Sequence, residues 1–212
     1  MNDVDALISS MTNRARALHD QADDMISDLQ ILLDLVHPQS ERLLFCSPVT
    51  AKIEASANIW GGDWFDATGY GTRYDATGKW AIHTGHDLNR PNYADAGATV
   101  YAAADGEIVF NGVVQGWQGC VIVIKHTLED GSNIWTRYAH VGISLARGSI
   151  KRGGVLATIA DYGSNGPKQD HLHFDGARID LGAHPGDWPG DDLPRVKRDY
   201  IDMAQWLRER GK

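Results

Sequence analysis

Short β-type runs separated by glycine turns fill the middle of this 212-residue chain and constrain its fold more than any other feature. Asp105-Gly106 and Asn111-Gly112 are dipeptides typical of tight hairpin turns, and apolar runs flank them. Runs this short and this regularly spaced predict an antiparallel sheet or sandwich rather than alternating strand-helix units. We therefore expect a mainly β domain over residues 46–185, with strands near residues 100–102, 107–110, 121–125, 134–138, 155–160, 171–174 and 177–181.

A heptad pattern precedes the β region. From Val4 to Val36 the apolar positions alternate spacings of four and three residues, which predicts one long helix over residues 3–37. Pro38 ends it, because the residue before a proline is pushed out of the helical region. Two interpretations stay open: a self-associating coiled coil or spacer arm, which would form a homodimer, and a helix packed on the domain.

A helical pattern also follows the β region. After a loop rich in Pro, Gly, Asp and Trp over residues 183–193, the apolar stripe from Val196 to Leu207 predicts one C-terminal helix that starts near Pro194. The expected organisation is a helical arm over residues 1–38, the β domain over residues 46–185, and a loop with a C-terminal helix over residues 186–212.

Composition excludes several classes of partner. Twenty Lys and Arg against 28 Asp and Glu give a net charge of −8, which argues against nucleic acid and against an anionic membrane surface as the main ligand. No apolar run approaches the roughly 20 residues of a membrane-spanning helix.

The sequence shows no secretion signal. Cys46 and Cys120 are too few for a disulfide scaffold or a cysteine zinc ribbon, and Cys120 is expected to be a buried free thiol.

Five of the nine histidines gather in three short stretches, at 83–86, at 140 and at 171–173. His171 and His173 alternate along an extended run, so both point to one face, and burying two unpaired imidazoles there would be costly. His83 and Asp87 add an imidazole and a carboxylate from a glycine-containing turn. Two histidines and one carboxylate form an established catalytic zinc site. The three stretches together predict a metal site, whereas His126 and His184 lie beside turns with no partner in view.

Several motifs then appear in a fixed order between residues 69 and 174. They are 71–73, His83-x-x-x-Asp87, 97–109, 119–126, Tyr138-Ala139-His140-Val141, 148–153 and His171-Leu172-His173-Phe174. In this combination the segment resembles the catalytic domain of the lysostaphin-type zinc endopeptidases, which cut the peptide part of bacterial peptidoglycan. The resemblance covers about half of the chain.

The resemblance implies a fold, a metal and a set of roles. The fold is a twisted antiparallel sheet with an open catalytic groove. One zinc ion is held by His83, Asp87 and His173, and His140 and His171 are the catalytic histidines that do not bind the metal. The implied substrate is a stem or cross-bridge peptide of peptidoglycan, so the chain is expected to be a cell-wall lysin.

Two positions depart from the family pattern. His86 stands where the family usually has an apolar residue, and we interpret it as a bystander rather than a competing ligand. Before His171 the segment Ser164-Asn165-Gly166-Pro167 is followed by three further residues, so this loop is longer than the family's short turn. The longer loop bears on substrate fit and not on the metal ligands.

The residues support a mechanism and leave alternatives open. One of His140 and His171 would take a proton from water, and the other would stabilise the oxyanion or protonate the leaving amine. Trp117, Trp135 and Tyr138 are candidates for the groove wall, and alternation with His140 favours Tyr138.

Two rival functions remain. A D-Ala-D-Ala carboxypeptidase also uses His, Asp and His, but with a wider first spacing. A non-cleaving scaffold of this fold that binds peptidoglycan or activates a hydrolase suits the long N-terminal helix. The implied substrate lies outside the cytoplasmic membrane, so a phage lysin, a virion-associated enzyme and a trimmed secreted protein all fit.

Overall fold

The computed structural model describes residues 10–16, 18–19, 21–22, 25–26, 28–29, 42–52, 58–76, 78–91, 95–161 and 170–211. The chain divides into two compact units, Met1–Glu41 and Arg42–Lys212. Among the described residues there is no helix that is both long enough and apolar enough to cross a membrane.

The first unit is helical where it is described. Residues 10–16 are helical, as are the shorter described stretches up to residue 29, and their side chains are exposed. The described part of this unit holds no continuous helix as long as the one expected over residues 3–37, and both ends of that expected helix lie outside the described residues. The coiled coil therefore stays a prediction.

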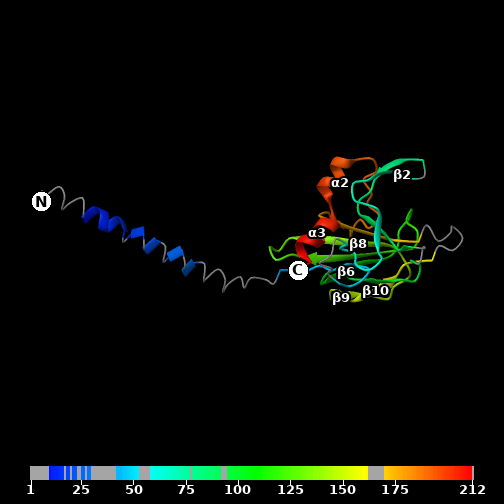
Figure 1. Cartoon of the computed structure of the whole chain (residues 1–212), viewed down its shortest axis with the longest axis horizontal. Coiled ribbons are helices and arrows are strands. Elements are labelled where there is room, and N and C mark those ends of the chain that lie inside the picture. Colours follow the sequence, from blue (N-terminus) through cyan, green and yellow to red (C-terminus); the bar gives the residue numbers. More distant parts are fainter. Residues whose placement is uncertain are drawn as a thin grey trace. The chain divides into compact units, whose positions relative to one another are not determined.

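The second unit is built on an antiparallel sheet, as expected (Figure 1). Its strands lie in the order β1, β4, β11, β8, β7, β6, β9, and β12 pairs with β11. Two small sheets pair β10 with β5 and β2 with β3. The bounds are β1 Phe65–Thr68, β2 Arg73–Asp75, β3 Trp80–Ile82, β4 His86–Asn89, β5 Thr99–Tyr101, β6 Gly106–Val113, β7 Cys120–Thr127, β8 Asn133–Val141, β9 Gly148–Ile150, β10 Val155–Thr158, β11 Leu172–Ala177 and β12 Tyr200–Ile201.

Strand alternation divides the side chains of the large sheet between two apolar clusters. On β7, Ile122 and Ile124 belong to the larger cluster, and Val121 and Val123 belong to the smaller one. On β8 and β11, Tyr138 and Phe174 face the larger cluster, whereas Ala139 faces the smaller one. Both sheet faces are covered, which is why the central strands are apolar on both sides. Cys46 and Cys120 are both buried and form no disulfide, as expected for Cys120.

A β-bulge interrupts the alternation of β8 at His140. Cys120 of β7 lies opposite Val141 and Val121 lies opposite Ala139, so His140 is the extra residue on β8. Its backbone φ is +62°, in the left-handed region that non-glycine residues rarely adopt. Without the bulge, His140 would share the face of Tyr138. The bulge instead turns it toward the face that carries His173 of β11.

The single C-terminal helix predicted from Pro194 is wrong. The segment forms helix α2 (Leu193–Asp199), strand β12, and helix α3 (Met203–Arg210). Tyr200 and Ile201 pair with β11, so the backbone of these two residues is extended. Asp202 then begins α3 by accepting hydrogen bonds from the N–H groups of Ala204 and Gln205. The apolar stripe was correctly placed, because Val196, Tyr200, Met203 and Leu207 are all buried, but strand pairing breaks the helix that carries it.

Candidate metal centre and catalytic groove

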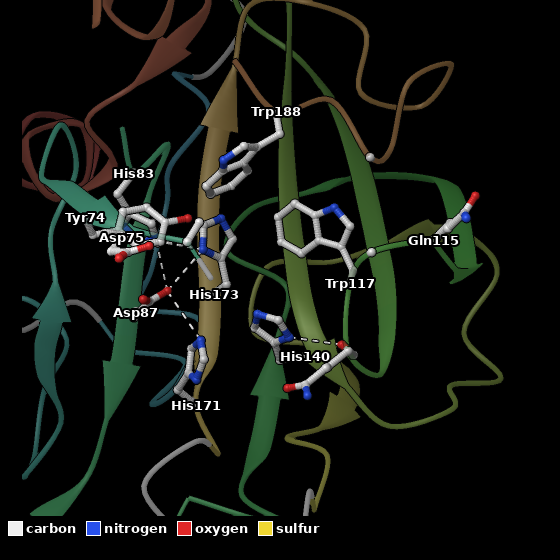
Figure 2. Close-up of a pocket in the computed structure, with 14 residues that line it drawn as sticks. Tyr74, Asp75, His83, Asp87, Gln115, Trp117, His140, His171, His173 and Trp188 are labelled. Carbon is white, nitrogen blue, oxygen red and sulfur yellow. Dashed lines mark hydrogen bonds and ion pairs between the residues drawn. The ribbon is translucent and has the colours of Figure 1, made fainter. Parts of the chain in front are cut away.

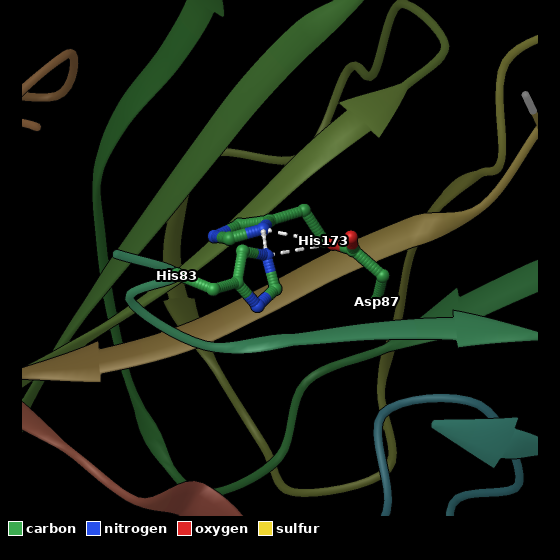
Figure 3. Close-up of side chains that lie close together, drawn as sticks. All are labelled: His83, Asp87 and His173. Atoms are coloured by element: carbon green, nitrogen blue, oxygen red, sulfur yellow. Dashed lines mark hydrogen bonds and ion pairs between the residues drawn. The ribbon is translucent and has the colours of Figure 1, made fainter. Parts of the chain in front are cut away.

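Three side chains meet at one point on the large sheet (Figure 3). His83 Nε2 lies 3.0 Å from His173 Nδ1 and 3.0 Å from Asp87 Oδ1, and His173 Nδ1 lies 3.1 Å from Asp87 Oδ1. The three atoms thus form a nearly equilateral triangle of electron-pair donors. Among the described residues this is the one group of three or more His, Cys, Asp or Glu side chains placed to hold a metal ion.

Strand pairing and a tight turn make this triangle. Asp87 on β4 lies directly opposite His173 on β11, which places their side chains together on one face. His83 comes from the turn between β3 and β4. Gly85 lets that turn press against β11, since a Cβ on Gly85 would lie 2.3 Å from the carbonyl oxygen of Phe174. Only glycine fits this close approach.

The donor set fits a zinc ion. An ion held tetrahedrally at about 2.0–2.1 Å sets its ligand atoms about 3.3 Å apart, close to the 3.0–3.1 Å edges of the triangle. Two imidazole nitrogens and one carboxylate oxygen leave a fourth position for water, as in catalytic zinc sites. His83, Asp87 and His173 are therefore suited to hold this metal.

Electrostatics keep the carboxylate of the triangle ionised. Burial raises the pKa of Asp87, but hydrogen bonds with His173 and His83 outweigh burial and hold that pKa well below the usual range. Burial lowers the pKa of His173, but Asp175 and Asp87 outweigh it and raise that pKa. An ionised carboxylate is the form that coordinates a cation.

His140 and His171 lie beside the triangle, with ring centroids 4.6 Å apart (Figure 2). His140 Nδ1 is 3.0 Å from the carbonyl oxygen of Gln118, so Nδ1 carries the proton that is donated and Nε2 keeps a lone pair. Burial, followed by the nearby His171 and His173, lowers the pKa of His140 to about 3. His171 Nε2 lies 3.5 Å from Asp87 Oδ1. All five residues singled out in the sequence thus line one cavity.

That cavity has a volume of about 730 Å³ and aromatic walls. Trp117 and Trp188 pack edge to face, with ring centroids 5.3 Å apart, and both contact His173. Tyr74 lies edge-on to His83, and burial together with Asp87 raises the pKa of Tyr74 to about 12, so its hydroxyl stays protonated. Figure 2 shows these rings gathered around the histidines.

Of the three aromatic residues expected in the groove wall, Trp117, Trp135 and Tyr138, one lines the cavity. Trp117 lines the cavity, and Trp135 is not among the lining residues. The expectation for Tyr138 is wrong, because Tyr138 is fully buried in the larger apolar cluster and its hydroxyl accepts a hydrogen bond from the N–H of Ala103. The β-bulge explains this error, since Tyr138 and His140 do not share a face. Trp188 and Tyr74 also line the cavity, and no motif in the sequence marked either residue as part of the site.

The remaining histidine predictions have clear outcomes. His86 is not part of the triangle: its Nδ1 lies 2.6 Å from Asp66 Oδ2 and its ring contacts Trp60, on the opposite face from Asp87. His126 is buried with a partner on each nitrogen, the carbonyl oxygen of Asp105 at 2.8 Å and the hydroxyl of Thr136 at 2.7 Å. The longer loop before His171 falls on residues 162–169, outside the described residues.

Comparisons with known proteins agree with this geometry. Residues 81–181 match Peptidase family M23. The chain is 37% identical over 135 residues to the DD-carboxypeptidase/endopeptidase Mpg of Neisseria meningitidis serogroup B and to that of Neisseria gonorrhoeae, covering 63% of this chain. It spans only 28% of the length of these relatives. Lysostaphin from Staphylococcus simulans has the same fold, with a TM-score of 0.51 at 19% identity, over 79% of this chain and 56% of that one.

Proposed function

This chain belongs to peptidase family M23 through residues 81–181, and from that premise we propose that it is a zinc-dependent endopeptidase that hydrolyses peptide cross-links of bacterial peptidoglycan. The observation that carries the proposal is the triangle of His83, Asp87 and His173 at an open cavity that also holds two further histidines. The names of the Neisseria relatives, carboxypeptidase and endopeptidase, support peptide hydrolysis.

His83, Asp87 and His173 are assigned as the ligands of one zinc ion. When bound there, zinc supplies Lewis-acid polarisation of the scissile carbonyl and lowers the pKa of water to about 7. Asp87 brings the negative charge of the donor set. Both imidazoles would bind the cation in their neutral form, since a protonated imidazole has no lone pair to offer.

His140 is assigned as the general base. Its Nδ1–H is donated to the carbonyl oxygen of Gln118, so Nε2 presents a lone pair toward the cavity. His171 is assigned to the other role: it donates a proton to the developing oxyanion or to the leaving amine. The two rings lie side by side, with 4.6 Å between their centroids, so both can reach one bound peptide group.

The substrate is assigned as an extended peptide. The cavity is open and its walls are Trp117, Trp188 and Tyr74, whose flat faces suit the small side chains and exposed backbone of a stem or cross-bridge peptide. Because peptidoglycan lies outside the cytoplasmic membrane, the site of action is extracytoplasmic, as a phage lysin, a virion-associated enzyme or an exported protein.

The test is a turbidity assay on purified cell walls with the full chain. Clearing is expected with zinc, is lost with a chelator and returns when zinc is added back, and mass spectrometry of the released fragments identifies the bond that is cut. A chain that binds zinc but releases no fragment from any wall type would instead support the second candidate, a non-cleaving peptidoglycan-binding or hydrolase-activating scaffold.

The helical arm is assigned to self-association. Met11, Leu18 and Met25 recur every seven residues and are each at least 60% exposed in the described residues. A heptad seam of this kind is buried when two copies pair. Light scattering of the full chain is expected to give a dimer, and Leu18→Asp with Met25→Asp a monomer. A monomeric wild-type chain would exclude the dimer and favour a spacer arm.

A further inference from the structure

A buried arginine lies directly behind the metal triangle, on the same sheet face. Arg137 on β8 is opposite Asp175 on β11, and both side chains are fully buried. Arg137 Nε lies 3.1 Å from Asp175 Oδ1, and Arg137 Nη2 donates to Asp175 Oδ2. Two buried charges are tolerated only when geometry and further hydrogen bonds satisfy them.

Asp175 in turn holds the metal-facing imidazole. His173 Nε2 lies 3.1 Å from Asp175 Oδ2, and the hydroxyl of Thr84 donates to the same oxygen at 2.7 Å. A carboxylate paired with arginine is ionised and can only accept hydrogen bonds. Asp175 is therefore an acceptor for a proton on His173 Nε2, and a cation bound at Nδ1 leaves the single proton of a neutral His173 on that Nε2. Without a cation, the ionised Asp87 also faces Nδ1 at 3.1 Å.

The two histidines of the triangle differ in this respect. His83 Nδ1 is buried and has no hydrogen-bond partner among the described residues, whereas both nitrogens of His173 are engaged. Among the described residues, therefore, a carboxylate behind the metal triangle (Asp175) orients His173 and does not orient His83.

Arg137 also holds one wall of the cavity. Its Nη1 donates to the carbonyl oxygens of Pro185 at 3.0 Å and of Asp187 at 2.9 Å, on either side of the cavity-lining Gly186 and just before Trp188. Its Nη2 also reaches the hydroxyl of Thr84 at 3.4 Å. All five N–H groups of the guanidinium therefore have acceptors, and its face packs 4.5 Å from the ring centre of Trp117.

We propose that Arg137 is a positioning residue that, through Asp175, fixes the metal-binding tautomer of His173 and, through the carbonyls of Pro185 and Asp187, fixes the wall that carries Trp188. The assignment to a reaction rests on the proposed function, but the two positioning effects are properties of the folded chain. Lysine would keep the charge and lose the planar fork that reaches both partners at once.

The first test needs no variant. Nitrogen-15 NMR of the zinc-loaded full chain is expected to show the metal on Nδ1 of His173 and the proton on Nε2. A proton on Nδ1 would overturn the proposal whatever the variants do.

The second test separates the two effects with Asp175→Asn and Arg137→Lys. An asparagine amide can donate as well as accept, so Asp175→Asn is expected to mix the His173 tautomers and to weaken zinc binding about 10- to 100-fold in a chelator competition. Arg137→Lys is expected to weaken zinc binding similarly and also to speed hydrogen exchange of the backbone over residues 185–188, which Asp175→Asn leaves slow.

Asp105→Asn is the matched control, because Asp105 pairs with Lys151 and Arg152 away from the cavity. It is expected to bind zinc as the wild type does. Zinc affinity and tautomer unchanged in Asp175→Asn would refute the proposal. The variants could show the expected changes in zinc affinity and His173 tautomer although the chain cleaves no cell wall. In that case the inference about Arg137 holds and the proposed function fails.

Discussion

Asp87 and His173 are opposite each other on the antiparallel strands β4 and β11, with Asp87 Oδ1 3.1 Å from His173 Nδ1, although 86 positions separate them in the sequence. Register between these two strands therefore decides whether a metal site exists. A slip of one residue would send one of the two side chains to the opposite face of the sheet.

Ligand and base substitutions should separate metal binding from turnover. His173→Ala removes a corner of the triangle and is expected to lose both zinc and cell-wall hydrolysis. His140→Ala leaves the triangle intact and is expected to keep zinc and lose about 10²- to 10⁴-fold in turnover, the usual contribution of a general base. Metal content by elemental analysis and rates of wall clearing measure the two effects. Full zinc content in His173→Ala would contradict the ligand assignment.

Gly85→Ala should damage the fold and the metal centre together. Its Cβ would lie 2.3 Å from a backbone carbonyl of β11, which cannot move without disturbing the β4–β11 pairing. We expect a loss of about 3 kcal/mol in unfolding free energy, at the upper end of overpacking costs, and weaker zinc binding.

Gly142→Ala is the matched control for that substitution. A Cβ there meets its nearest atom at 3.5 Å, an ordinary contact, so stability should change by less than about 1 kcal/mol. Urea denaturation of both variants in chelator makes the comparison. Equal unfolding free energies for Gly85→Ala and Gly142→Ala would show that the fold does not depend on the close approach of Gly85 to β11.

Stability of the metal-free chain should fall with acidification because of His126. Burial lowers the pKa of His126 from 6.5 to about 4. Between pH 6.5 and pH 4, His126 is therefore protonated in the unfolded chain and neutral in the folded chain. The contribution to stability is complete above pH 6.5, is lost as pH falls toward 4, and amounts to about 3 kcal/mol.

Urea denaturation from pH 7.5 to pH 4 checks this, with His126→Gln as the comparison. Glutamine does not titrate, so the stability of this variant should depend less on pH across the window, whatever its absolute stability. Identical pH dependence of the two chains would exclude His126 as the source.

The aromatic wall should govern substrate affinity more than chemistry. Trp188→Ala widens the cavity beside His173 and is expected to raise KM about tenfold, the effect of losing about 1.4 kcal/mol of contact, with zinc retained. Trp80→Ala is the control, since Trp80 is 54% exposed and is not among the cavity-lining residues. A change in kcat with no change in KM for Trp188→Ala would show that Trp188 contributes to the chemical step and not to substrate affinity.

Local patterns predicted much of the site. The alternation of His171 and His173, and the four-residue spacing of His83 and Asp87, act over one strand or one turn, so the chain itself constrains where those side chains point. The same holds for the mainly antiparallel fold, which follows from short runs and turn dipeptides.

Pairing between distant segments decided the rest. The bulge that moves His140 onto the site face exists only in the register of β8 against β7, and the break between α2 and α3 exists only because Tyr200 and Ile201 pair with β11. His126 is neutral and satisfied only because Thr136 and Asp105 are brought to it.

The sequence by itself determined which side chains are available to bind a metal and, within each strand or turn, which of them share a face. Only the tertiary structure decided that three of them meet within hydrogen-bonding distance, and that Arg137 and Asp175 lie buried behind them. The reason is physical: alternation and turn geometry are set by neighbouring peptide units, whereas register, bulges and the pairing of buried charges depend on contacts between residues far apart in the chain.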